Sequence, residues 1–143
     1  MSNESSLQRF VEAQETSYST ALSEVKQGRK RSHWMWYIFP QLQGLGMSST
    51  SHYYGLRGAA EAEQYAKHPV LGPRLLTLCE ALLQLKGSDA TTIMGSPDDM
   101  KLKSSMTLFA SLPAADPVFQ RVLDKFYQGT QDPNTLRLLG RQL

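Results

Sequence analysis

The segment RKRSHWMWYIFPQ, from Arg29 to Gln41, concentrates side chains that bind small molecules. It holds three cations, one imidazole and four aromatic rings within one short stretch. Cationic groups pair with anions, and aromatic faces stack on flat rings or on cations. This density is more than a core helix needs, so the segment predicts a pocket for a small, anionic, nucleotide-like ligand.

His33 lies inside this segment and is the candidate catalytic residue. An imidazole exchanges protons near neutral pH, which suits acid–base catalysis or anion binding. Turnover of the ligand would make the protein a transferase or hydrolase with His33 as the acid–base group. The alternative is a histidine that only caps a helix or makes a hydrogen bond. The sequence leaves open whether the protein is an enzyme.

Seven other residues are candidate ligand contacts because they offer cations, rings or a carboxamide. They are Arg31, Trp34, Trp36, Gln41, Tyr54, Arg74 and Lys101. Each also has a structural explanation: tryptophans commonly fill a core, a loop carboxamide can bond the backbone, and cations favour helix C-termini. Arg74 is different because an arginine near the start of a helix opposes the helix dipole, which indicates a specific partner.

The hydroxyl cluster from Ser48 to Ser51 comes just before Tyr54. Hydroxyls and backbone amides at a helix start can hold a phosphate group. The same cluster is also typical of a simple helix cap. The sequence does not decide between these two interpretations.

No metal site and no cofactor are predicted. The three histidines, at positions 33, 52 and 68, lack the close spacing of zinc ligands. No phosphate-binding loop or catalytic triad signature can be read from the sequence. The single cysteine, Cys79, lies in an apolar run, so it is expected to be a buried hydrophobic residue, and no internal disulfide can form.

Helical periodicity precedes the aromatic segment. From Leu7 to Val25, apolar residues recur at three- and four-residue steps, which is typical of an amphipathic helix that ends at Gly28. The polar residues between them, including Glu24, are expected on the solvent side. Ser32 is expected to cap a short helix over residues 33–39, which Pro40 then ends.

The rest of the chain also favours helices. They are expected over residues 59–67 and 71–85, with a turn or two before Gly55. Three later helices are expected where an oxygen-bearing cap precedes a proline, at Ser96-Pro97, Asp116-Pro117 and Asp132-Pro133. No extended run alternates as a strand does. We therefore expect an all-α, compact single-domain bundle of about six to eight helices over residues 1–143, with the first few residues disordered.

Composition narrows the class of protein. The chain has 143 residues, of which 41% are hydrophobic, enough for one core. Its formal net charge of +2 lacks the strong positive field of a typical nucleic-acid-binding domain, so nucleic acid is not the expected partner. No apolar stretch is long enough to span a membrane, and no signal peptide is recognisable. A cytoplasmic location is expected.

Several segments together resemble the bacterial DUF1810 family, a family of unknown function. They are GRKRSHWMWYIFPQLQGLG (28–46), SHYYGL (51–56), HPVLGPRL (68–75) and DMKLKSSMTLFASL (99–112). The resemblance covers nearly the whole chain. It implies a single helical domain, and it assigns no catalytic residue.

Two functions from different classes therefore compete. The first is a site for a small anionic or nucleotide-like ligand, with or without turnover. The second is a non-enzymatic protein–protein interaction module, in which the aromatic segment anchors a partner or a second copy of the chain, because aromatics and arginine dominate interface hot spots. A purely structural role for the tryptophans is the remaining alternative.

Overall fold

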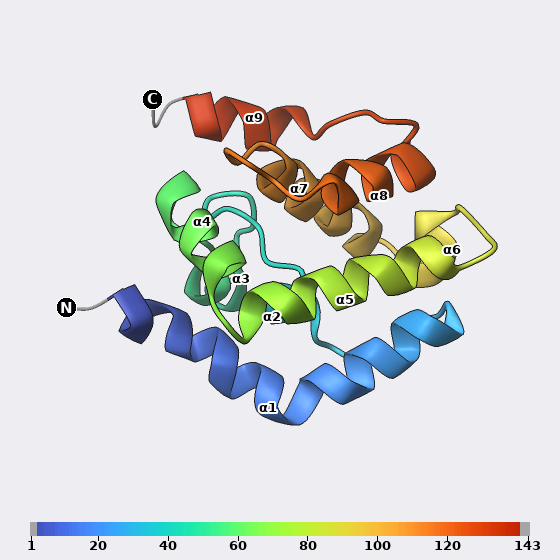
Figure 1. Cartoon of the computed structure of the whole chain (residues 1–143), viewed down its shortest axis with the longest axis horizontal. Coiled ribbons are helices and arrows are strands. Elements are labelled where there is room, and N and C mark those ends of the chain that lie inside the picture. Colours follow the sequence, from blue (N-terminus) through green and yellow to red (C-terminus); the bar gives the residue numbers. More distant parts are fainter. Residues whose placement is uncertain (1–2, 141–143) are drawn as a thin grey trace.

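The computed structural model describes residues 3–140, with side chains from Leu7 onward. Nine α-helices lie in this range, six of them with at least seven residues, and it contains no strand (Figure 1). The predicted all-α class is confirmed. Met1 and Ser2, for which disorder was predicted, lie outside the described residues, and the first helix begins at Asn3.

The helices follow one another with short connections. Their bounds are α1 (Asn3–Gln27), α2 (Met35–Ile38), α3 (Ser49–Tyr54), α4 (Ala59–Lys67), α5 (Leu71–Gln84), α6 (Ala90–Met94), α7 (Asp98–Ala110), α8 (Pro117–Tyr127) and α9 (Pro133–Gly140). The short helix α6 is the element that sequence periodicity did not predict. Within the described residues, no helix is both long and apolar enough to cross a membrane.

Helix α5 lies at the centre of the bundle. Figure 1 shows α1 along one side of α5, with α7 and α8 on the other side and α9 beyond them. Helix α4 contacts α5 and α7, while α2 and α3 pack together beside α1. Leu75, Leu78 and Leu82 of α5 are fully buried, as expected for a leucine-rich helix covered on two sides.

The end of α1 sets the direction in which the aromatic segment leaves. Gly28 has φ +77°, a left-handed conformation that suits glycine. Its N–H donates to Val25 O, and the N–H of Arg29 donates to Glu24 O, which is the Schellman pattern of a helix C-terminus. The predicted helix end at Gly28 is confirmed.

Two of the three predicted proline-linked caps are confirmed. The Asp116 carboxylate accepts a hydrogen bond from Val118 N, and the Asp132 carboxylate accepts one from Thr135 N. The third is wrong: the Ser96-Pro97 peptide bond is cis, and Pro97 itself occupies the N-cap position of α7 without a side-chain cap.

The expected helix over residues 33–39 is shorter, because its expected cap is used elsewhere. Ser32 Oγ donates to Glu24 Oε2 over 2.6 Å instead of capping a helix. Helix α2 therefore begins only at Met35, and Trp34 is its N-cap without a side-chain hydrogen bond.

Candidate functional site

Glu24, at the end of α1, is the anchor of the aromatic segment. Its Oε1 accepts hydrogen bonds from Arg31 N at 2.7 Å and Ser32 N at 3.0 Å, and its Oε2 accepts the bond from Ser32 Oγ. The indole Nε1 of Trp34 also donates to Oε1, over 2.9 Å. Glu24 is only 7% exposed, so the expectation that it faces solvent is wrong. One carboxylate thus satisfies the backbone and the indole at the turn between α1 and α2.

The same contacts keep Glu24 ionised. Burial raises the pKa of this carboxyl group, but the hydrogen bonds from Ser32, Arg31 and Trp34 outweigh burial and lower the pKa to about 2. A carboxylate that accepts several hydrogen bonds is stabilised in its charged form. The contacts with Glu24 therefore give a structural explanation for some of the polar and aromatic residues of the segment.

A cavity of about 200 Å³ opens between α2, α3, the loop that joins them and α7. We call it the α2–α3 pocket. Four of the predicted contacts line it: Trp36, Gln41, Tyr54 and Lys101. The rest of its wall consists mainly of Met35, Phe39, Leu42 and Met47, which sequence reasoning had not selected as contacts, and of Ser48 and Ser51 from the predicted hydroxyl cluster. The glycine-containing loop after Phe39 was the available signal for Leu42 and Met47.

Two glycines let the pocket wall close tightly. A Cβ atom at Gly46 would lie 2.5 Å from Ser51 Oγ, and one at Gly55 would lie 2.6 Å from Gln43 Cα. Backbone hydrogen bonds join the loop after α2 to the residues after α3. Leu56 N donates to Gln41 O at 2.9 Å, and Gln43 N donates to Leu56 O at 2.8 Å. The pocket floor is therefore built from paired backbone and is largely preformed.

The hydroxyls of the Ser48–Ser51 cluster are used inside the cap of α3. Ser48 Oγ accepts from Ser51 N at 3.1 Å, and Ser51 Oγ donates to Ser48 O at 2.9 Å. Helix α3 has only six residues. These contacts favour the capping interpretation over a phosphate site at this helix start.

Positive charge is concentrated at the edge of the pocket. Lys101 Nζ lies 5.2 Å from the centre of the Trp36 ring and 3.6 Å from Asp98 Oδ1. Asp98 is closer to a second ammonium group, because Lys30 Nζ lies 2.8 Å from its Oδ2. Two ammonium groups therefore share one carboxylate, and Lys101 is the only charged residue among those that line the cavity in the described part of the chain. The local field favours an anion.

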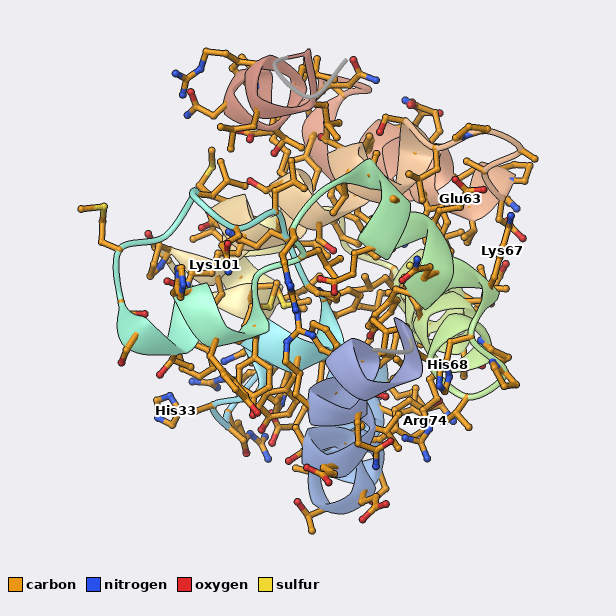
Figure 2. The ribbon with its side chains drawn as sticks, turned by 90° about the vertical axis from the view of Figure 1, so that its left-hand side faces the viewer. His33, Glu63, Lys67, His68, Arg74 and Lys101 are labelled. Atoms are coloured by element: carbon orange, nitrogen blue, oxygen red, sulfur yellow. The ribbon has the colours of Figure 1, made fainter. Side chains whose placement is uncertain are left out.

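Arg74 lies apart from this pocket. Figure 2 shows His33 and Lys101 on one side of the molecule and Arg74 with His68 on the other, beyond α1. The guanidinium of Arg74 donates to Gln14 Oε1 at 3.3 Å and lies 4.8 Å from the centre of the Tyr18 ring. The specific partner that the sequence indicated is thus α1 itself.

Three further candidates do not line the α2–α3 pocket. Trp34 is 1% exposed and bound to Glu24, so it belongs to the core. Arg31 and His33, at the start of the segment, are exposed on the surface and do not line the pocket. The structure therefore brings together four of the eight predicted site residues and separates the other four.

A histidine at the end of a helix can bond the last carbonyl groups of that helix, but His68, which follows α4, makes other contacts. Its Nδ1 instead accepts hydrogen bonds from Val70 N at 3.1 Å and Leu71 N at 3.2 Å, at the start of α5. Among the described residues, no group of three or more His, Cys, Asp or Glu side chains converges as metal ligands do. Cys79 is fully buried, as predicted, and burial raises the pKa of its thiol.

Comparison with known proteins gives a family and a fold. A family model described as protein of unknown function (DUF1810) matches residues 4–139. The crystal structure of the conserved hypothetical protein Rv1873 from Mycobacterium tuberculosis is similar, with a TM-score of 0.91 and 46% sequence identity. That similarity covers 94% of this chain and 96% of the other. No curated protein matches the chain.

Proposed function

Since the chain belongs to the DUF1810 family, whose description names no activity, we propose a function from its pocket: the α2–α3 pocket binds the flat ring of a small anionic molecule. The observation that carries this proposal is the position of Lys101, which shares the Asp98 carboxylate with Lys30, at an otherwise uncharged, mainly apolar cavity. Ligand sites are typically concave and apolar with a few placed polar groups.

The size of the cavity limits the ligand. At about 200 Å³ it is smaller than the pockets of roughly 300 Å³ and more that enclose drug-sized molecules. A single ring system fits inside, next to Trp36 and Tyr54. For a nucleotide-like ligand, the base enters and the phosphate stays outside the cavity, near Lys101. A carboxylate on a single aromatic ring fits the same arrangement.

Titration calorimetry with AMP, nicotinate and 4-aminobenzoate tests the proposal. We expect binding of at least one of these anions, and we expect Lys101→Met to weaken it by about tenfold, as the loss of one close charge contact does. Lys103→Met is the matched control, because it removes the same charge from the same helix at a residue that does not line the pocket. Equal losses in the two variants, or no binding by any probe, would overturn the proposal.

The acid–base role of His33 stays a prediction that this pocket does not require. His33 is exposed and lies outside the α2–α3 pocket. We therefore expect His33→Ala to bind the same probes as the wild type. A tenfold loss of affinity in this variant would move the site toward the predicted surface of His33 and Arg31.

A protein–protein interaction module is the second candidate. Its original anchor, the pair of tryptophans, is reduced to Trp36, since Trp34 is buried. However, Met47 is 100% exposed, and Tyr53 and Met100 are 57% and 52% exposed, which offers apolar surface for a partner. Analytical ultracentrifugation over a range of concentrations tests self-association, and a dimer that Met47→Ser disrupts would favour this function.

A further inference from the structure

Gln41 lines the α2–α3 pocket with an unusual polar group. Its Oε1 is buried and has no hydrogen-bond partner among the described residues. The backbone of Gln41 is fixed, because its carbonyl oxygen accepts the hydrogen bond from Leu56 N. Gln41 itself is partly buried at the cavity wall, and its acceptor oxygen, which solvent does not reach, stays unpaired.

Folding alone does not explain a glutamine at this position. Buried polar atoms are nearly always paired, and an unpaired acceptor destabilises the folded state. The neighbouring wall residues Met35, Phe39 and Leu42 are apolar and buried. An apolar side chain of similar size would therefore suit the fold better than a carboxamide.

We propose that Gln41 is a specificity-determining residue, which accepts a hydrogen bond from an N–H group on the ring of the bound anion. The inference rests on the proposed function of the pocket and narrows its ligand class. The ligand is a flat anion with an amino group or a ring N–H, in which the N–H meets Gln41 and the anionic group meets Lys101. Selectivity follows because a site with an unpaired acceptor favours the ligand that pairs it.

The first test needs no ligand. Gln41→Met removes the unpaired acceptor at nearly constant volume, so we expect the melting temperature of the free protein to rise by about 3 °C. The control is Gln43→Met in the same loop, where the Gln43 Nε2 donates to His52 O at 2.8 Å. We expect no rise in that control, because a satisfied group is lost. A fall in the melting temperature of Gln41→Met would show that the acceptor is paired in solution and would overturn the inference.

The second test compares ligands that differ only in the donor. Two pairs are suitable: 4-aminobenzoate with 4-methylbenzoate, and AMP with purine riboside 5′-monophosphate. We expect the wild type to prefer the amino member by about fivefold or more, Gln41→Met to bind both members equally, and Lys101→Met to weaken both alike.

The outcomes separate the two claims. Binding without a preference for the amino member, or a preference that Gln41→Met retains, would overturn the inference and leave the proposed function standing. The absence of binding for all four compounds would overturn the proposed function and, with it, the ligand class inferred here.

Discussion

Trp34 and Trp36 are two residues apart but have opposite surroundings. Trp34 is sealed in the core and donates its indole N–H to Glu24, whereas Trp36 is half-buried at the α2–α3 pocket. The difference arises because α2 begins only at Met35, after a turn held by the Glu24 carboxylate. One indole is therefore a structural group, and the other is available for a ligand.

Replacing each tryptophan by phenylalanine separates these roles. Trp34→Phe should lower the free energy of unfolding by about 2–3 kcal/mol, since it leaves a gap in the core and removes a hydrogen bond to a buried carboxylate. Trp36→Phe should change it by less than about 1 kcal/mol. Urea unfolding followed by circular dichroism measures both. Equal losses would contradict the assignment of Trp34 to the core and Trp36 to the pocket.

Residue types were predictable from the sequence, but their partners were not. The sequence selected Trp36, Gln41, Tyr54 and Lys101, which line one cavity. The sequence did not distinguish these four residues from the other candidates. In the sequence, Glu24 has the pattern of a surface residue on an amphipathic helix. Its contacts with the turn after α1 depend on the path of the chain after Gly28, which the sequence pattern does not give. Tertiary contacts decided which of the cations lies at the pocket.

At the scale of elements, the contact between α4 and α5 depends on one glycine. A Cβ atom at Gly72 would lie 2.3 Å from the carbonyl oxygen of Ala66. Glycine normally weakens a helix by up to about 1 kcal/mol relative to alanine. At position 72, a Cβ atom would clash with the backbone of α4. Glycine therefore stabilises the protein more than alanine would at this position.

Gly72→Ala should therefore reduce the free energy of unfolding by about 2 kcal/mol, despite the better helix propensity of alanine. The control is Gly87→Ala, where a Cβ atom would meet nothing within 4 Å, and its stability should be unchanged or slightly higher. Thermal and urea unfolding of the two variants provide the comparison. A stabilised Gly72→Ala variant would mean that α4 and α5 are farther apart than described.

Helix α5 ends on a lysine from another helix. Lys125 Nζ, from α8, donates to the carbonyl oxygens of Leu82 at 3.2 Å, Leu83 at 3.0 Å and Leu85. Lys125→Met should lower the free energy of unfolding by about 1–2 kcal/mol, because these carbonyl oxygens lose their cationic hydrogen-bond donor. Hydrogen exchange should speed up in the last turn of α5. The exposed Lys86→Met is the control, and an equal effect there would rule out the proposed cap.

The long helices were predictable because their apolar residues recur with helical spacing. Their ends also carry recognisable signals, either a glycine or a capping residue followed by proline. The five-residue helix α6 shows no such periodicity. The cap pattern worked at Asp116 and Asp132 but not at Ser96, where the peptide bond to proline is cis. Local patterns thus fixed the class and most elements, while short elements depended on their neighbours.

For the whole molecule, the depressed pKa of Glu24 links stability to pH. The pKa is about 2 in the folded protein against 4.5 for an unperturbed glutamate. Because the folded state binds the proton more weakly, the stabilisation is complete above about pH 4.5 and is lost as the pH falls toward 2. It amounts to as much as about 3 kcal/mol at neutral pH.

Glu24→Gln should therefore be less stable than the wild type at pH 7, and the difference should shrink to nearly zero at pH 2. Urea unfolding at a series of pH values measures this difference directly, and contributions of other carboxyl groups cancel between the two proteins. A difference that is independent of pH would show that the Glu24 carboxylate is not selectively stabilised in the folded state.

We propose that the α2–α3 pocket, and no other part of the aromatic segment, receives a flat anion. The two indoles provide an internal comparison in ¹H–¹⁵N spectra of the labelled protein titrated with AMP or 4-aminobenzoate. The indole N–H resonance of Trp36 should shift progressively to saturation, while that of Trp34, bound to Glu24, should stay in place. A titration that moves Trp34 alone, or neither resonance, would contradict the account.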